Sequence, residues 1–230
     1  GLGEFEQVLF RLDPGAEGRR ILRYDVKEKS WGPLYLALGL NLRSDFEQDA
    51  EWALLVNVTR RSLNALGAEW RNEFEFGSRQ RVLSEFYQPL HAAGVLFLAP
   101  TAEYRSETEA IYADDAHVAD YDVKKTEARL DLGIQLRRYA ELRAGPVWGT
   151  GRAEVETGAT NLPTSEADYA GWKIGLIVDR QDRTVFAREG YYLSVDGVSA
   201  NDDWGGDVDF DKLSGVFRTF QSFGDHTFTV

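Results

Sequence analysis

The 230-residue sequence contains no cysteine and no methionine. Without cysteine, the chain has neither disulfides nor thiolate metal sites. It also lacks any run of the roughly 18 apolar residues that a helical membrane span needs. Its 26 basic residues are outnumbered by 38 acidic ones. Since the basic residues form no concentrated patch, nucleic acid is not an expected partner.

Other absences bear on processing and on chemistry. A primary translation product begins with methionine, so we expect a segment of a longer protein whose signal peptide lies upstream. The histidines, His91, His117 and His226, are far apart in the sequence, and we therefore predict no metal site and no cofactor. No Gly-x-Ser-x-Gly pentapeptide occurs, so we expect no catalytic residue in this segment.

Apolar and polar residues alternate strictly in about ten segments. Residues 34–44 carry leucine at every even position from 36 to 42, and residues 127–137 carry apolar side chains at the even positions and mostly charged ones at the odd positions. Alternation gives a β-strand one apolar and one polar face. Charges facing lipid would cost about 2–4 kcal/mol each near the midplane. The pattern therefore predicts an all-β fold, an antiparallel transmembrane β-barrel with its charged face inside.

The chain divides into two predicted parts. Residues 1–31 form the last hairpin of a small domain, with strands at 5–12 and 20–27, and residues 32–230 form the barrel. The barrel strands are expected at 34–44, 50–61, 68–77, 81–88, 95–106, 117–136, 140–154, 168–182, 190–200 and 210–222, with another starting near Thr227. The longest connections, around 107–117, 157–168 and 201–209, are all expected outside the cell.

A soluble β-sandwich or barrel also alternates and is the alternative fold. Sandwich strands usually have about 5–6 residues, whereas these have about 10–20, which favours the membrane barrel. The numerous aromatic residues, ten Tyr, thirteen Phe and six Trp, suit membrane-interface belts. The predicted interface aromatics are Trp52, Trp70, Trp148 and Trp172.

Three segments carry a resemblance to a known family. Residues 28–35 read Glu-Lys-Ser-Trp-Gly-Pro-Leu-Tyr, 66–73 read Leu-Gly-Ala-Glu-Trp-Arg-Asn-Glu and 84–90 read Ser-Glu-Phe-Tyr-Gln-Pro-Leu. They resemble the C-terminal part of bacterial patatin-like phospholipases, in which an outer-membrane barrel of the bacterial surface antigen superfamily follows a lipase domain. The resemblance implies that residues 1–30 end a polypeptide-transport-associated (POTRA) domain. It places the junction with the barrel at Trp31, Gly32 and Pro33.

A second motif resembles a turn found across that superfamily. Residues 179–182 read Asp-Arg-Gln-Asp and 186–192 read Phe-Ala-Arg-Glu-Gly-Tyr-Tyr. Relative to the superfamily, the arginine is displaced by one position and the proline is replaced by Ala187. The favoured interpretation is an ordinary turn with aspartates accepting from backbone N–H groups; a role in organising the lumen is the alternative. The predicted turn residues are Asp179, Asp182, Phe186 and Gly190.

The resemblance implies a function and several partners. It implies that the whole protein hydrolyses phospholipid acyl esters with a Ser-Asp dyad upstream of Gly1, and that this segment anchors and helps to export that domain. Related barrels have about sixteen strands, so about 120 residues are expected after Val230. Expected partners are outer-membrane lipid, the upstream patatin-like domain, barrel-assembly machinery and a second copy. Two alternatives are a translocation or assembly pore without an enzyme, and a soluble ligand-binding β-domain.

Overall fold

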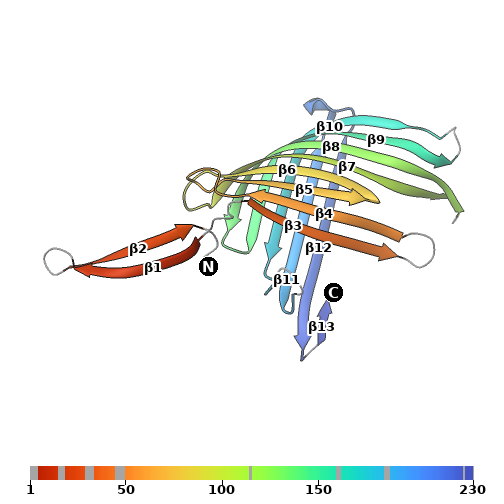
Figure 1. The fold of residues 1–230 in the computed structure, drawn as a ribbon. Helices are drawn as coiled ribbons and strands as arrows, with labels where there is room; N and C mark the ends of the chain where they lie inside the picture. Colours follow the sequence, from red (N-terminus) through yellow and green to blue (C-terminus); the bar gives the residue numbers. More distant parts are fainter. Residues whose placement is uncertain are drawn as a thin grey trace.

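A computed structural model describes residues 5–14, 19–28, 34–44, 50–113, 116–158, 162–183, 187–224 and 226–229. It contains a two-stranded hairpin and an 11-stranded sheet in which the strands are neighbours in chain order. Every described pairing is antiparallel. Figure 1 shows the large sheet curling, so that β11 and β12 lie at a steep angle to β3 through β6. The predicted all-β antiparallel fold is confirmed.

The strands of the hairpin are β1 (Phe5–Pro14) and β2 (Arg20–Glu28). The large sheet consists of β3 (Leu34–Ser44), β4 (Ala50–Arg60), β5 (Glu69–Gly77), β6 (Arg79–Pro89), β7 (Leu96–Ala113), β8 (Ala116–Leu136), β9 (Ala140–Gly158), β10 (Ser165–Asp179), β11 (Gly190–Ala200), β12 (Phe210–Phe223) and β13 (His226–Thr229). A short 3-10 helix, η2 (Asp202–Trp204), lies between β11 and β12. In the described residues no helix is long and apolar enough to cross a membrane.

Several strand ends differ from the prediction. The connection expected at 107–117 is mostly strand, because β7 continues to Ala113 and pairs with β8 through a bulge after Ile111. Alternation does not reveal this extension, because residues 107–109 are polar on both faces and residues 110–113 are Ala-Ile-Tyr-Ala, apolar on both faces. Backbone ladder hydrogen bonds continue the strand there. By contrast, β10 ends earlier than predicted, at Asp179 instead of residue 182, so the connection to β11 is longer than expected.

Burial in the large sheet is the reverse of that in a soluble protein. Leu36 is 65% exposed and Leu132 is 54% exposed, whereas Glu127 is 4% exposed and Asp131 is 2% exposed. The two kinds of residue occupy opposite faces of the strands, as the alternation predicts. The sheet therefore has one apolar face that is open and one polar face whose side chains are crowded together.

The polar face is the concave one. Glu85 on β6 and Arg143 on β9 form an ion pair of 2.6 Å between Oε2 and Nη1, although two strands lie between them in the sheet. Neighbouring strands are about 4.8 Å apart, so a flat sheet would separate these backbones by about 14 Å. Curvature toward this face brings the two side chains together.

Glycines on the concave face make room for aromatic rings. A Cβ added at Gly133 would lie 2.0 Å from Cζ of Phe97, and one added at Gly149 would lie 2.3 Å from Cζ of Tyr169. Phe97 is fully buried, and Tyr169 packs with Val147 in a small apolar cluster. Each ring lies across a neighbouring strand where only hydrogen fits, which fixes the register of side chains across the concave face.

Candidate functional site

A first network of ion pairs links strands across the concave face, near the turn between β8 and β9. Arg71 Nη1 on β5 contacts Glu85 Oε1 on β6 at 3.2 Å. Glu85 in turn contacts Arg143 on β9, and Arg143 Nη2 contacts Glu141 Oε1 at 2.5 Å. Gln135 on β8 donates a further hydrogen bond to Glu141. Charges that alternate in sign across neighbouring strands stabilise their pairing.

A second network lies further along the same face. Arg81 on β6 donates from Nε to Glu103 Oε1 at 2.8 Å and from Nη1 to Glu73 Oε2 at 2.8 Å. Glu103 on β7 also accepts from Arg105 Nη2 at 2.8 Å. One carboxylate oxygen thus joins two guanidinium groups, and both of its donors approach from the concave side.

Glu127 on β8 is the centre of a third network. Its Oε2 accepts a hydrogen bond of 2.7 Å from the Tyr169 hydroxyl and contacts Lys125 Nζ at 2.9 Å. Its Oε1 lies 3.4 Å from Lys173 Nζ and 3.4 Å from Arg129 Nε. The side chain of Glu127 is only 5% exposed, so these partners replace the water that an exposed carboxylate would have.

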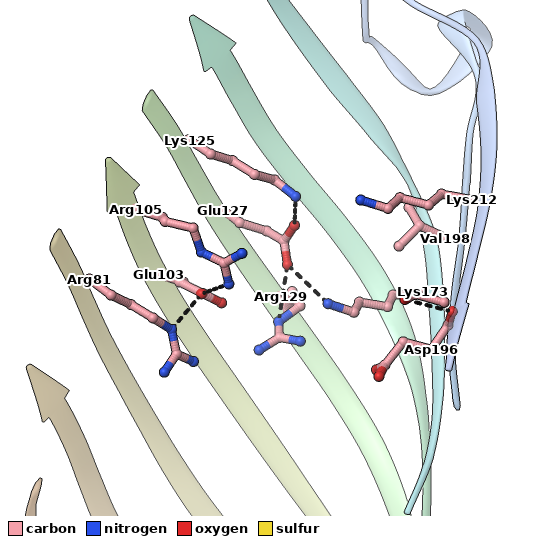
Figure 2. Close-up of a pocket in the computed structure, with 11 residues that line it drawn as sticks. Arg81, Glu103, Arg105, Lys125, Glu127, Arg129, Lys173, Asp196, Val198 and Lys212 are labelled. Atoms are coloured by element: carbon pink, nitrogen blue, oxygen red, sulfur yellow. Dashed lines mark hydrogen bonds and ion pairs between the residues drawn. The ribbon is translucent and has the colours of Figure 1, made fainter. Parts of the chain in front are cut away.

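The second and third networks line a cavity of about 320 Å³. Figure 2 shows side chains from β6, β7, β8, β10, β11 and β12 directed into this space. The residues that line it are Arg81, Glu103, Arg105, Lys125, Glu127, Arg129, Lys173, Asp196, Val198, Lys212 and Ser214. Six of them are basic and three are acidic. We call this space the basic cavity.

The convex face carries an apolar band, which β8 and β9 show most clearly. On β8 the outward-facing residues are apolar from Ala128 to Leu136, whereas those nearer the start of the strand are the polar Asp122, Lys124 and Thr126. On β9 the band runs from Ala140 to Trp148 and is followed by Thr150 and Arg152. Each stretch is nine residues long, and a tilted transmembrane strand needs about 9–11.

The four predicted interface tryptophans all lie on the convex face. Trp52, Trp70, Trp148 and Trp172 are 53%, 47%, 50% and 49% exposed. Trp148 and Trp172 lie on the neighbouring strands β9 and β10, at the edge of the apolar band that borders the polar residues Thr150 and Arg152. Trp172 also packs edge-on against Trp204 of η2, with 5.8 Å between the ring centroids. Trp70 lies toward the opposite end of its strands and donates from Nε1 to Ser84 Oγ at 2.9 Å.

The connection between β10 and β11 is organised by its aspartates. Asp182 Oδ1 accepts from the backbone N–H of Arg188 at 2.8 Å and of Glu189 at 3.2 Å. These two hydrogen bonds stabilise the carboxylate and hold the pKa of Asp182 below its ordinary value of 3.8. Asp179 Oδ1 accepts from the backbone N–H of Gln181 at 3.0 Å.

Of the other two predicted turn residues, the structure describes Gly190 but not Phe186. Gly190 has φ +110, and a Cβ there would lie 2.0 Å from the carbonyl oxygen of Arg180, so glycine is required. Phe186 and the junction residues Trp31, Gly32 and Pro33 lie outside the described residues.

The sequence indicated which residues share the concave face but missed the basic cavity. Glu127 and Tyr169 are separated by 42 positions, and only the register of β8, β9 and β10 brings them together. The signal in the sequence that could have indicated the cavity is the presence of Arg or Lys at inward-facing positions of β6, β7, β8, β10 and β12. Within the described ranges there is no group of three or more His, Cys, Asp or Glu residues that could hold a metal ion.

Comparisons with known proteins identify the fold. No family model matches the sequence, and no curated protein matches it. Among solved structures, the chain is similar to BamA from Haemophilus ducreyi lacking POTRA domains 1-3, with a TM-score of 0.67 and 14% sequence identity. The match covers 95% of this chain and 43% of that chain. The likeness shows that this chain has the fold of part of a transmembrane β-barrel like that of BamA.

Proposed function

We propose that this chain is the wall of an outer-membrane β-barrel of the bacterial surface antigen superfamily, with the convex face in contact with lipid and the concave face lining a hydrated lumen. The observation that carries this proposal is the reversed burial, in which leucines are open and carboxylates are enclosed. An apolar band nine residues high suits the hydrocarbon core. Tryptophans at its ends suit the two membrane interfaces.

We further propose that the barrel anchors a patatin-like phospholipase domain encoded upstream and takes part in its export. The support is the resemblance at residues 28–35, 66–73 and 84–90, together with a β1–β2 hairpin that precedes the large sheet and, in the residues that the structure describes, pairs with none of its strands. In this arrangement the hairpin is periplasmic, and the connections after β3, β5, β7, β9 and β11 lie outside the cell.

A second candidate is a protein assembly or translocation pore without an enzyme domain. The fold likeness to BamA favours it. The two candidates differ in what precedes the segment: a lipase nucleophile motif in the first case and several POTRA repeats in the second. Both place the segment in the outer membrane, with lipid as its surroundings and barrel-assembly machinery as a partner.

The full-length protein, expressed with its upstream sequence, tests both levels of the proposal. Phospholipase activity that is lost when an upstream Gly-x-Ser-x-Gly serine is replaced, in protein from the outer-membrane fraction, supports the anchored lipase. Inactive protein in the same fraction supports the pore. Protein that stays monomeric in the soluble fraction without detergent contradicts both.

Two arginine substitutions test the orientation of the sheet. Leu132→Arg places a charge in the convex apolar band, and Gln135→Arg places one on the concave face of the same strand. The first should destabilise the inserted barrel by about 2–4 kcal/mol because a charge at the midplane loses its hydration. The second should leave membrane insertion close to that of the wild type. Equal amounts of the two variants in the outer-membrane fraction would contradict the assignment of faces.

A further inference from the structure

The basic cavity has a local excess of positive charge. Six basic and three acidic residues line it, a formal balance of +3 in a chain whose net charge is −12. Like charges held together repel one another, and the low-dielectric walls of a barrel strengthen the field inside it. A cavity with this balance therefore attracts anions.

Two of the three acidic groups of the cavity are already engaged with basic groups, and the third, Asp196, accepts from the Ser194 hydroxyl at 3.3 Å. Glu103 Oε1 accepts from both Arg81 and Arg105 at 2.8 Å. Glu127 uses both oxygens, accepting from Tyr169 at 2.7 Å and contacting Lys125 at 2.9 Å and Lys173 at 3.4 Å. These two carboxylates cannot neutralise further basic groups without giving up partners.

Three basic groups keep unused donors. Lys212 has no hydrogen bond or ion pair within the described part of the chain. Arg129 contacts Glu127 only through its enclosed Nε, at 3.4 Å, and its Nη1 and Nη2 atoms make no hydrogen bond among the described residues. Lys173 reaches Glu127 only at 3.4 Å. In Figure 2, Lys212 and Lys173 extend from the far side of the cavity toward Glu127 on β8.

We propose that the basic cavity binds a phosphoryl group through Lys212, Lys173 and Arg129. A phosphate monoester carries close to two negative charges at neutral pH and offers three acceptor oxygens. This matches a surplus of three cations whose free donors approach from β8, β10 and β12. A monocarboxylate carries one charge and would leave most of the surplus in place. The cavity volume of about 320 Å³ also accommodates part of the molecule that bears the phosphate.

Pyrophosphate titration of the full-length protein, folded in zwitterionic detergent at low salt, tests the proposal. Calorimetry should show saturable binding by the wild type and no saturable binding of acetate. Lys212→Gln should raise the dissociation constant about tenfold, equivalent to about 1.4 kcal/mol. The double variant Lys212→Gln and Lys173→Gln should abolish saturable binding. Lys212 has no partner in the described residues, so its replacement should leave the fold intact, which circular dichroism checks.

The matched control is Lys124→Gln. Lys124 lies on β8 beyond the apolar band, on the convex face, where it pairs with Asp122 at 2.6 Å. This variant removes the same charge from the protein but not from the cavity, so its dissociation constant should equal that of the wild type. An equal weakening by Lys124→Gln and Lys212→Gln would show nonspecific attraction and overturn the proposal, as would binding of acetate as tight as that of pyrophosphate.

A second titration distinguishes the sources of the phosphoryl group. Dihexanoyl phosphatidic acid, used below its critical micelle concentration, presents the group on a lipid headgroup, whereas pyrophosphate presents it free in water. Binding of both, weakened by Lys212→Gln, supports a site open to lipid headgroups. Binding of pyrophosphate alone supports a site for water-soluble phosphates. Failure of both probes to bind the wild type overturns the proposal and leaves the membrane proposal untouched, because that proposal rests on the convex face.

Discussion

Replacing Glu127 with glutamine should destabilise the barrel more than any exposed charge removal. The Glu127 side chain is 5% exposed and its partners Arg129 and Lys173 are 12% and 19% exposed. Removing one member of a buried ion pair costs about 3–5 kcal/mol because the remaining charge is left desolvated and unpaired. Lys125 is 47% exposed and can turn toward water, so its pair contributes only about 0–1 kcal/mol. Glutamine keeps the shape and can still accept from Tyr169, which places the expected loss near 3 kcal/mol, the low end of the range.

Urea unfolding of the protein in lipid vesicles, followed by tryptophan fluorescence, measures this difference. The matched control is Glu154→Gln, which removes the same charge from a pair with Arg152 whose side chains are 39% and 51% exposed. That control should unfold at nearly the same urea concentration as the wild type, because both groups of this exposed pair are hydrated. Adding Lys173→Gln to Glu127→Gln should restore part of the loss, because it removes a cation that no longer has its carboxylate. If Glu127→Gln and Glu154→Gln had the same unfolding midpoint, the reasoning about the enclosed network would be refuted.

Two further predictions concern a tight contact and a turn. Gly149→Val should cost about 1–3 kcal/mol by overpacking, because a Cβ there would meet the Tyr169 ring at 2.3 Å. A Cβ at Gly151, on the same strand, would meet nothing within 4 Å, so Gly151→Val should unfold at nearly the same urea concentration as the wild type. Equal losses of stability in the two variants would contradict the packing. The pKa of Asp182 is held below 3.8 in the fold, so its stabilising hydrogen bonds are fully present above pH 3.8 and are lost as pH falls through the lower folded pKa. The stability advantage of the wild type over Asp182→Asn should therefore shrink below pH 3.8, and an advantage that grew in acid would show the sign to be wrong.

The periodicity of the sequence was sufficient to predict the strands and their faces. The leucines at even positions from 36 to 42 are all more than 60% exposed on the convex face, which the two-residue repeat of a strand requires. Strand ends were harder to predict where the alternation breaks down, as at residues 107–113, because three polar residues are followed there by four apolar ones while the backbone hydrogen bonding continues. Only backbone pairing, not side-chain type, extends β7 there.

The ion-pair networks of the concave face, and the basic cavity among them, could not be predicted from periodicity alone. Glu85 and Arg143 are separated by 58 positions and by two intervening strands, and they meet because the sheet curves. Curvature depends on twist, bulges and on glycines such as Gly133, which admits the Phe97 ring. The sequence shows that charges face inward, whereas the register decides which of them pair and leaves Lys212 without a partner in the described residues.

Single-cysteine labelling tests the central claim most directly, since the sequence contains no cysteine and each variant carries one label. A nitroxide at Leu132→Cys, on the convex apolar band, should collide with oxygen dissolved in the bilayer and be protected from a water-soluble nickel chelate. A nitroxide at Ser214→Cys, which lines the basic cavity, should show the opposite preference. Power-saturation electron paramagnetic resonance on protein in lipid vesicles measures both. Greater access of the nickel chelate to position 132 than to position 214 would contradict a barrel with its apolar face in lipid.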